Sequence, residues 1–202
     1  MIDIFADSEY VGHHFAGIEL TDTLIEDREF SQCSFTKCQF LNCQFKNCAF
    51  IDYAFTHCDI SSLKVTGSRF ITSRFEECKA IGIDWTKSSA FSLSLAFNKS
   101  VLDYSLFHRL EIADLQITDC RMREADFEDA LIAKAHFEGS ELMGTKFWHT
   151  DLRGANFAGA KGYAIDPREN KIKGATFSLP DALVLLELLE VKIEGFSANE
   201  PG

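Results

Sequence analysis

Residues 30–58 read FSQCSFTKCQFLNCQFKNCAFIDYAFTHC, with Phe at six successive fifth positions and Cys two positions before four of them. Apolar residues continue at every fifth position from Tyr10 to Phe75. After a two-residue shift in phase they continue from Phe97 to Phe157. Neither the 3.6-residue period of an α-helix nor the 2-residue period of a strand gives this spacing. The chain is therefore predicted to be a short-period repeat protein.

Each five-residue unit offers one large apolar residue and, two positions earlier, a second restricted residue, which is most often Cys, Ser or Ala. The other three positions are mostly polar. Two inward positions in five suit a chain that turns a corner every five residues. If four units close one coil, residues twenty apart stack in ladders, such as Phe35, Phe55 and Phe75, or Phe107, Phe127 and Phe147. Each ladder is buried only when neighbouring coils cover it, as repeat architectures require.

A family resemblance supports this interpretation. The units Ala125-Asp126-Phe127, Ala135-His136-Phe137 and Ala155-Asn156-Phe157 resemble the A(D/N)LXX consensus of the pentapeptide-repeat family. That family folds as a right-handed quadrilateral β-helix, an all-β repeat solenoid. The resemblance covers roughly residues 10–177 and concerns the fold more than the function.

The expected organisation has four parts. Residues 1–9 form an N-terminal cap or tail, and residues 10–177 form the β-helix with a phase slip near 91–97. Residues 178–195 form a C-terminal capping and dimerisation helix plus a short strand, and residues 196–202 form a tail. At the slip we expect a bulge or a looped-out side. It is either a tolerated insertion or a protrusion that contacts a partner, since loops on one face of a solenoid often bind.

Composition points to a cytoplasmic protein without a membrane span. The amino terminus carries Asp3 and Asp7 where a signal peptide would be basic, and no apolar run approaches the roughly 20 residues of a transmembrane helix. Pro is scarce, with three residues, as a continuous ladder of backbone hydrogen bonds requires.

The cysteines follow the repeat. Cys33, Cys38, Cys43 and Cys48 occupy the position that holds Ser or Ala in other units, and they lack the paired Cys-x2–4-Cys spacing of metal sites. Reduced, buried thiols are therefore favoured over a metal site or disulfides, and no cofactor is expected.

No catalytic motif is present. The sequence lacks a P-loop, G-x-G-x-x-G, G-x-S-x-G and H-E-x-x-H. His57, His108, His136 and His149 fall on outward positions, so they do not indicate a converging active site. The chain is expected not to be an enzyme.

Charge excludes a nucleic-acid binder of the usual kind. The net charge is −11, from 31 acidic and 20 basic residues, whereas nucleic-acid binders are basic. About seven coils at about 4.8 Å each give a rod of about 35 Å, or one net charge per about 3 Å, against about 1.7 Å in duplex DNA. The acidic surface either imitates DNA toward a basic partner or simply keeps the rod soluble.

The carboxy-terminal end changes period. Ser178-Leu179-Pro180-Asp181 resembles a capping box, and the following residues to Glu190 are apolar nearly all round. One side of this helix can seal the open end of the solenoid, and a two-fold dimer can cover the other. The expected dimer interface consists of Leu183, Leu185, Leu186, Leu189, Val191 and Ile193.

This end is similar to the dimerisation module of the Qnr/MfpA-type pentapeptide-repeat proteins, and Ala80-Ile81-Gly82-Ile83 is similar to a mid-chain segment of the Qnr group. The resemblance implies a homodimeric DNA mimic that binds DNA gyrase or topoisomerase IV and protects it from quinolones or toxins. The alternative is a pentapeptide-repeat scaffold with another protein partner. The expected acidic contact consists of Asp103, Glu111, Asp114, Asp119, Glu124, Asp126, Glu128 and Asp129. The expected apolar contact at the slip consists of Trp85, Phe91 and Leu93.

Overall fold

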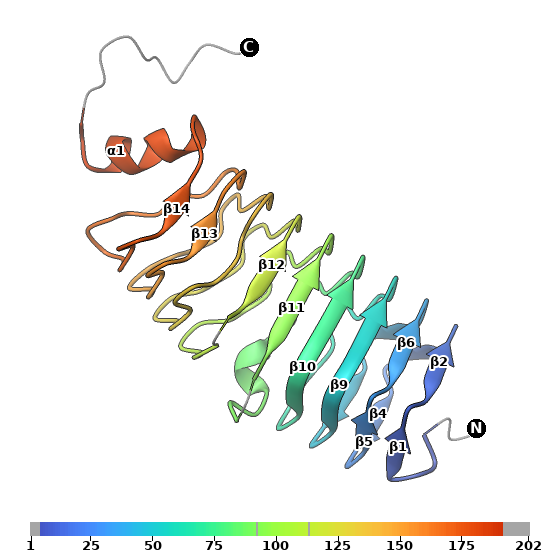
Figure 1. Cartoon of the computed structure of the whole chain (residues 1–202). Helices are drawn as coiled ribbons and strands as arrows, with labels where there is room; N and C mark the ends of the chain where they lie inside the picture. Colours follow the sequence, from blue (N-terminus) through green and yellow to red (C-terminus); the bar gives the residue numbers. More distant parts are fainter. Residues whose placement is uncertain (1–4, 92, 113, 192–202) are drawn as a thin grey trace.

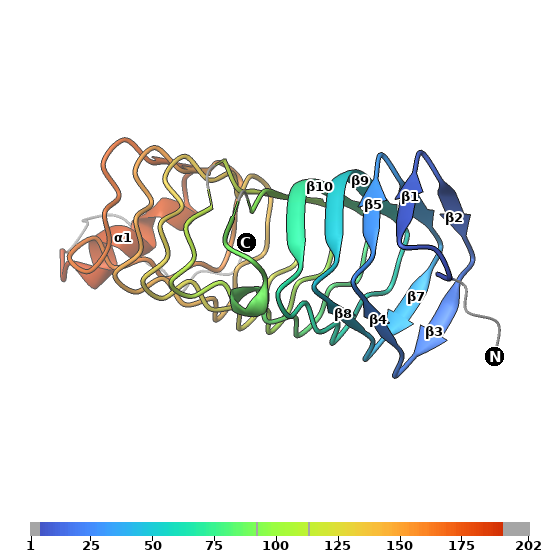
Figure 2. The ribbon, with the colours of Figure 1, turned by 90° about the horizontal axis from the view of Figure 1, so that it is seen from below.

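The computed structural model describes residues 5–91, 93–112 and 114–191. Over these residues the chain forms a right-handed quadrilateral β-helix of about eight coils. The first coil lies at one end of the rod and helix α1 at the other (Figure 1). Seen from below, the coils stack side by side along one long axis (Figure 2). The predicted fold class is therefore confirmed.

Short strands in the amino-terminal half give way to isolated bridges in the carboxy-terminal half. The strands are β1 (Glu9–Val11), β2 (His14–Ala16), β3 (Glu19–Thr21), β4 (Leu24–Glu26), β5 (Glu29–Ser31), β6 (Ser34–Thr36), β7 (Gln39–Leu41), β8 (Gln44–Lys46), β9 (Ala49–Thr56), β10 (Arg69–Glu76), β11 (Leu95–Asn98), β12 (Gln116–Thr118), β13 (Asn156–Phe157) and β14 (Thr176–Phe177). The helices are the 3-10 turns η1 (Trp85–Lys87) and η2 (Asp181–Leu183) and the α-helix α1 (Val184–Leu188).

Parallel pairing joins residues twenty apart. Phe30 pairs with Phe50, and Phe50 with Phe70. Farther along the chain the same spacing continues through single bridges such as Asp126 with Lys146. Four five-residue units thus make one coil, and each unit contributes one rung to one of four faces.

We name each face after one of its inward residues. The inward residues are Tyr10, Phe30, Phe50, Phe70, Ile112, Ile132, Leu152 and Ile172 on the Phe50 face; Phe15, Phe35, Phe55, Phe75, Phe97, Ile117, Phe137, Phe157 and Phe177 on the Phe55 face; Leu20, Phe40, Ile60, Ala80, Leu102, Met122 and Leu142 on the Phe40 face; and Ile25, Phe45, Val65, Trp85, Phe107, Phe127 and Phe147 on the Phe45 face.

A left-handed backbone conformation turns the chain at the corners. The second residue after an inward residue commonly has a positive φ, as Asp22 (50°) and Asn42 (53°) do. Asp, Asn and Gly recur at these corners because they tolerate this region better than other residues. Polar and small residues thus recur in the sequence because the chain turns a corner every five residues.

The phase slip is a coil with two additional residues. Ser73 pairs with Leu95, and Phe75 with Phe97, at a spacing of 22 instead of 20 residues. The Ser89 amide still donates to the Ser68 carbonyl in the regular register. The additional residues therefore lie between Ser89 and Leu95, next to η1, and the ladder resumes unchanged after them.

Hydrogen bonds explain the residue types at the second inward position. The Ser68 hydroxyl donates to the Phe45 carbonyl at 2.9 Å, and the Thr150 hydroxyl to the Phe127 carbonyl at 2.9 Å. The Cys48 thiol donates to the Ile25 carbonyl at 3.4 Å. A small donor at this position satisfies a carbonyl of the previous coil inside the core, where an unpaired acceptor would be costly.

Both ends of the core are covered. Phe5 is buried and makes edge-on contacts with Tyr10, Phe15 and Phe30. At the other end, Val184 and Leu185 pack against the core. No helix in the described part of the chain is long and apolar enough to cross a membrane.

Candidate functional site

The eight acidic residues of the predicted contact do not share a face. Asp126, Glu128 and Asp129 belong to the Phe45 face, Asp103 and Glu124 to the Phe40 face, Glu111 and Asp114 to the Phe50 face, and Asp119 to the Phe55 face. The prediction of one acidic face formed by these residues is wrong. Twenty consecutive residues pass around all four faces, so acids that are close in sequence point in different directions.

Ion pairs further neutralise part of this group. Asp103 is only 7% exposed, and its carboxylate accepts from the Arg121 guanidinium at 2.7 Å and from the Arg123 amide at 2.9 Å. Asp129 lies 3.4 Å from the Arg109 guanidinium and 3.5 Å from the His149 imidazole. Asp103 is therefore held within the solenoid wall by the next coil, and its assignment as a partner contact is corrected.

The predicted apolar contact at the slip is also corrected for two of its three residues. Trp85 is completely buried and packs edge-on against Phe70, Phe75 and Phe97, and Leu93 is buried as well. Trp85 occupies an inward position of the repeat, which explains its burial. Phe91, in contrast, is 71% exposed and could meet a partner.

The residues of the predicted dimer interface divide into two groups. Leu183 is half-buried, and Leu185 is half-buried against the core, so Leu185 belongs to the cap. Leu186, Leu189 and Val191 are exposed on α1 and just after it. Ile193, and the strand expected around it, lie outside the described residues. The exposed trio remains available to a second copy.

Net charge is unevenly distributed along the rod. The sequence already shows this when the charges are summed segment by segment. Residues 5–60 carry nine acidic and three basic side chains, whereas residues 61–180 carry sixteen of each. The first coils are therefore strongly acidic, and the middle of the rod is neutral. Sequence reasoning placed the acidic contact in the neutral part.

The acids of the first coils lie on several faces and point outward. Glu9, Glu19, Asp22 and Asp27 are all exposed. Arg28, the base nearest to them in sequence, donates to the backbone carbonyls of Phe5 and Glu26. Its guanidinium thus pairs with peptide oxygens in this coil. Glu26 forms an ion pair with Lys46, whereas the four exposed carboxylates named above form no ion pair within the described residues and can act on a partner.

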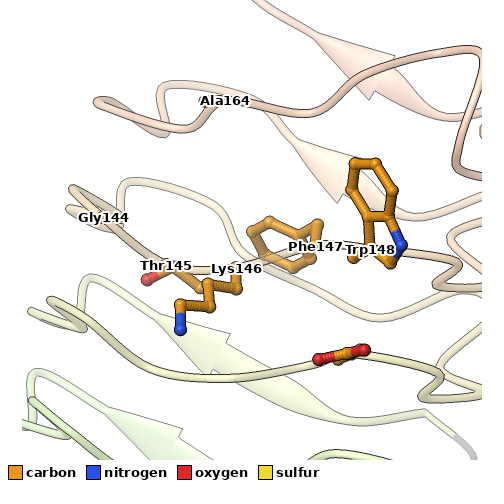
Figure 3. Close-up of a pocket in the computed structure, with 7 residues that line it drawn as sticks. Gly144, Thr145, Lys146, Phe147, Trp148 and Ala164 are labelled. Carbon is orange, nitrogen blue, oxygen red and sulfur yellow. The ribbon is translucent and has the colours of Figure 1, made fainter.

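A shallow hollow of about 530 Å³ opens on the Phe45 face near its corner with the Phe40 face. It is lined by Glu128, Gly144, Thr145, Lys146, Phe147, Trp148 and Ala164 (Figure 3). Sequence reasoning did not identify it. The sequence feature that could have indicated the hollow is Trp148, a tryptophan at an outward position of the repeat.

Neither a metal site nor a solvent-exposed thiol is visible in the described residues. No group of three or more His, Cys, Asp or Glu side chains is placed there to hold a metal ion. All seven cysteines are buried and free. Burial raises the pKa of the Cys48 thiol and raises the pKa of Cys120 to about 12. Thiols of this kind stay protonated at neutral pH and are poor nucleophiles.

Comparison with family models gives two matches. A pentapeptide repeat region model matches residues 28–107, and a model of eight pentapeptide repeats matches residues 120–159. The two matched segments lie on either side of residues 108–119, and both fall within the described solenoid. A comparison with curated proteins gives no match.

Similar solved structures include those of QnrB1, a plasmid-mediated fluoroquinolone resistance protein. The full-length QnrB1 structure has a TM-score of 0.61 at 19% identity, covering 91% of this chain and 100% of QnrB1. A trypsin-treated QnrB1 variant has a TM-score of 0.58 at 22% identity, covering 93% and 100%. At this identity the likeness establishes the shared fold.

Proposed function

Because the chain belongs to the pentapeptide-repeat family, we propose that it binds a type II topoisomerase, DNA gyrase or topoisomerase IV, by imitating DNA. In this proposal it is a non-catalytic cytoplasmic protein that protects the enzyme from quinolones or toxins. The acidic first coils, rather than the middle of the rod, meet the basic surface that normally holds DNA.

The charge density of the first coils is the observation that carries this proposal. Residues 5–60 have a net charge of −6. They make up just under three coils, or about 13 Å of rod at about 4.8 Å per coil, which gives one net charge per about 2 Å. Duplex DNA carries one per about 1.7 Å. The long-range electrostatic attraction of a basic groove selected for DNA would act on this segment far more than on residues 61–180, whose net charge is zero.

A two-fold dimer fits this arrangement. Helix α1 lies at the end of the rod opposite to the acidic coils (Figure 1), and Leu186, Leu189 and Val191 are exposed on it and just after it. A dimer formed there would be about 80 Å long by the same spacing, with one acidic segment at each far end. Each acidic end could then engage one half of a two-fold topoisomerase.

The test is a gyrase supercoiling assay with ciprofloxacin, using two variants with the same net charge. The amino-terminal variant is Glu9→Gln, Glu19→Gln, Asp22→Asn and Asp27→Asn. The middle variant is Glu111→Gln, Asp114→Asn, Asp119→Asn and Glu124→Gln. All eight residues are exposed, and each set changes the net charge from −11 to −7.

We expect the native protein to preserve supercoiling, the amino-terminal variant to lose most of this protection, and the middle variant to keep it. A greater loss of protection in the middle variant would show that the contact lies at the acidic residues that the sequence first suggested. If the native protein neither protects gyrase nor binds it at low salt, where charge attraction is strongest, the proposal is wrong.

A scaffold function remains the second candidate, and one observation favours it. The middle of the rod is neutral and exposes the large apolar side chains of Tyr104, Met143 and Trp148. Aromatic residues and Met are enriched at protein interfaces. The affinity for a partner bound there would depend little on salt concentration, whereas binding through the acidic coils would weaken as salt is added.

A further inference from the structure

The hollow on the Phe45 face combines an exposed aromatic ring with a carboxylate. Trp148 is 46% exposed, whereas its neighbour Phe147 is buried in the ladder. Figure 3 shows the indole standing away from the backbone while the Phe147 ring turns to the core. Trp148 therefore presents a large apolar surface to solvent at the rim of a concavity.

Small residues at the corner keep the hollow open. Gly144 has a φ of +72°, and a Cβ there would lie 2.4 Å from a carboxylate oxygen of Glu124. A side chain at this position would displace the carboxylate of Glu124, so glycine keeps this corner low. Ala164, which lies one coil farther along and also lines the hollow, adds little bulk. The concavity follows from the repeat itself, with small residues on two successive rungs of one corner.

Glu128 supplies the charge. Within the described residues, no ion pair and no side-chain hydrogen bond involves its carboxylate; only its amide donates, to Asp126 at 2.8 Å. A second hollow of about 240 Å³ on its other side is lined by His108, Arg109, Asp126 and Glu128. Glu128 therefore lies between two depressions as an available hydrogen-bond acceptor.

We propose that this hollow anchors an arginine side chain of the protein partner. The planar guanidinium would lie against the Trp148 indole while its N–H groups donate to Glu128. A tryptophan face is the best aromatic partner for a cation. Arginine suits the site better than lysine, because it stacks as a plane and donates in a fixed fork to a carboxylate.

This site deepens the proposed function, because a basic topoisomerase groove would offer such arginines. The acidic coils would provide long-range attraction, and the hollow one specific anchor in the neutral part of the rod. Trp and Arg are the residues that most often dominate binding energy at interfaces.

Tryptophan fluorescence tests the site without any topoisomerase. The chain has two tryptophans, and Trp85 is completely buried, so changes caused by an added peptide report Trp148. Hexa-arginine and hexa-lysine peptides of equal charge are titrated at the same ionic strength. We expect hexa-arginine to change the emission and to bind at least five-fold more tightly by this signal than hexa-lysine.

Two variants of equal net charge provide the control. Glu128→Gln should weaken the arginine signal about five-fold or more. Glu111→Gln, at an exposed residue on the Phe50 face, should leave it unchanged. Trp148→Ala should abolish the signal and should also weaken peptide binding followed by calorimetry. Equal responses to the two peptides, or equal losses in the two glutamate variants, would overturn the proposal, because they show general charge attraction only.

The same variants separate this site from the proposed function. If the native protein binds hexa-arginine through Trp148 and Glu128 but does not bind gyrase, the topoisomerase proposal fails and the anchor site stands. If gyrase binds and Glu128→Gln weakens it no more than Glu111→Gln, the topoisomerase proposal stands and the hollow is not its contact.

Discussion

Phe127 and Phe147 stack almost face to face, with ring centroids 5.3 Å apart and planes within 1° of each other. Phe107 stacks on Phe127 in the same way, at 4.8 Å and 9°. The three residues lie twenty apart in sequence, so each ring occupies the same place in successive coils. The Phe45 face therefore carries a column of three stacked rings in these coils, and the packing of the column depends on every ring in it.

Removal of one ring from the column should be costly. Phe127→Ala leaves a cavity between Phe107 and Phe147, and such truncations cost about 3–5 kcal/mol in packed cores. We expect the free energy of unfolding in urea to fall by this amount. Phe91→Ala is the control, because Phe91 is 71% exposed, and it should change stability by less than about 0.5 kcal/mol. Equal effects would contradict the assigned column.

Asp103 should act on stability and not on partner binding. Its carboxylate is buried and accepts from Arg121 and from the Arg123 amide of the next coil. Asp103→Ala leaves these donors unpaired and should cost about 1.5–3 kcal/mol, the range for hydrogen bonds to charged groups. Glu111→Ala, at an exposed acid, should be nearly neutral. Weaker topoisomerase binding by a fully folded Asp103→Ala protein would show that the residue is a contact after all.

Alkaline pH should destabilise the fold through the buried thiols. Burial raises the pKa of Cys120 from its ordinary value of 9.0 to about 12. Between these values the unfolded chain loses the thiol proton and the folded chain keeps it. The stabilisation is therefore complete below about pH 9 and is lost as pH rises toward 12, at about 1.4 kcal/mol per pH unit for one such group.

Cys120→Ser provides the measurement. Ser100 and Ser140 occupy the neighbouring rungs of the same column, so a hydroxyl fits there. Urea unfolding at pH 8, 9, 10 and 10.5 should show a smaller loss of stability in the serine variant than in the native protein. Identical pH dependence would mean that Cys120 does not titrate with this raised pKa.

The five-residue period predicted the fold because a single physical constraint, a corner every five residues, acts on nearly every position. The inward positions of Phe45 and Phe127 follow directly from it. The same period also places Trp85 inside, since Trp85 follows Val65 by twenty residues. Its position near the slip is what suggested a surface contact. Leu93 is different, because it lies within the additional residues, where no period applies.

The interaction surface could be predicted only in part. Sequence neighbours such as Asp119 and Glu124 appear clustered, but one unit turns the chain to the next face, so they project in different directions. Residues twenty apart are the true neighbours on the surface. The pairing of Asp103 with Arg121 illustrates this, since it joins successive coils. The hollow beside Trp148 depends on the small corner residues Gly144 and Ala164, twenty residues apart, and only the folded coil brings them together.

The last prediction separates the carboxy-terminal cap from the dimer interface. Leu185 packs against the core, whereas Leu189 is 38% exposed. Leu185→Asp would bury an unpaired carboxylate, which is costly, so it should open the cap and lower the melting temperature even in the monomer. Leu189→Asp should leave the coils folded and place a charge in the seam between two copies. Light scattering should then report a monomer for Leu189→Asp at a concentration where the native protein is a dimer, while circular dichroism remains native. A native protein that is monomeric at every concentration, or a Leu189→Asp protein that stays dimeric, would show that this face does not join two copies, and the acidic coils would then act from a single rod.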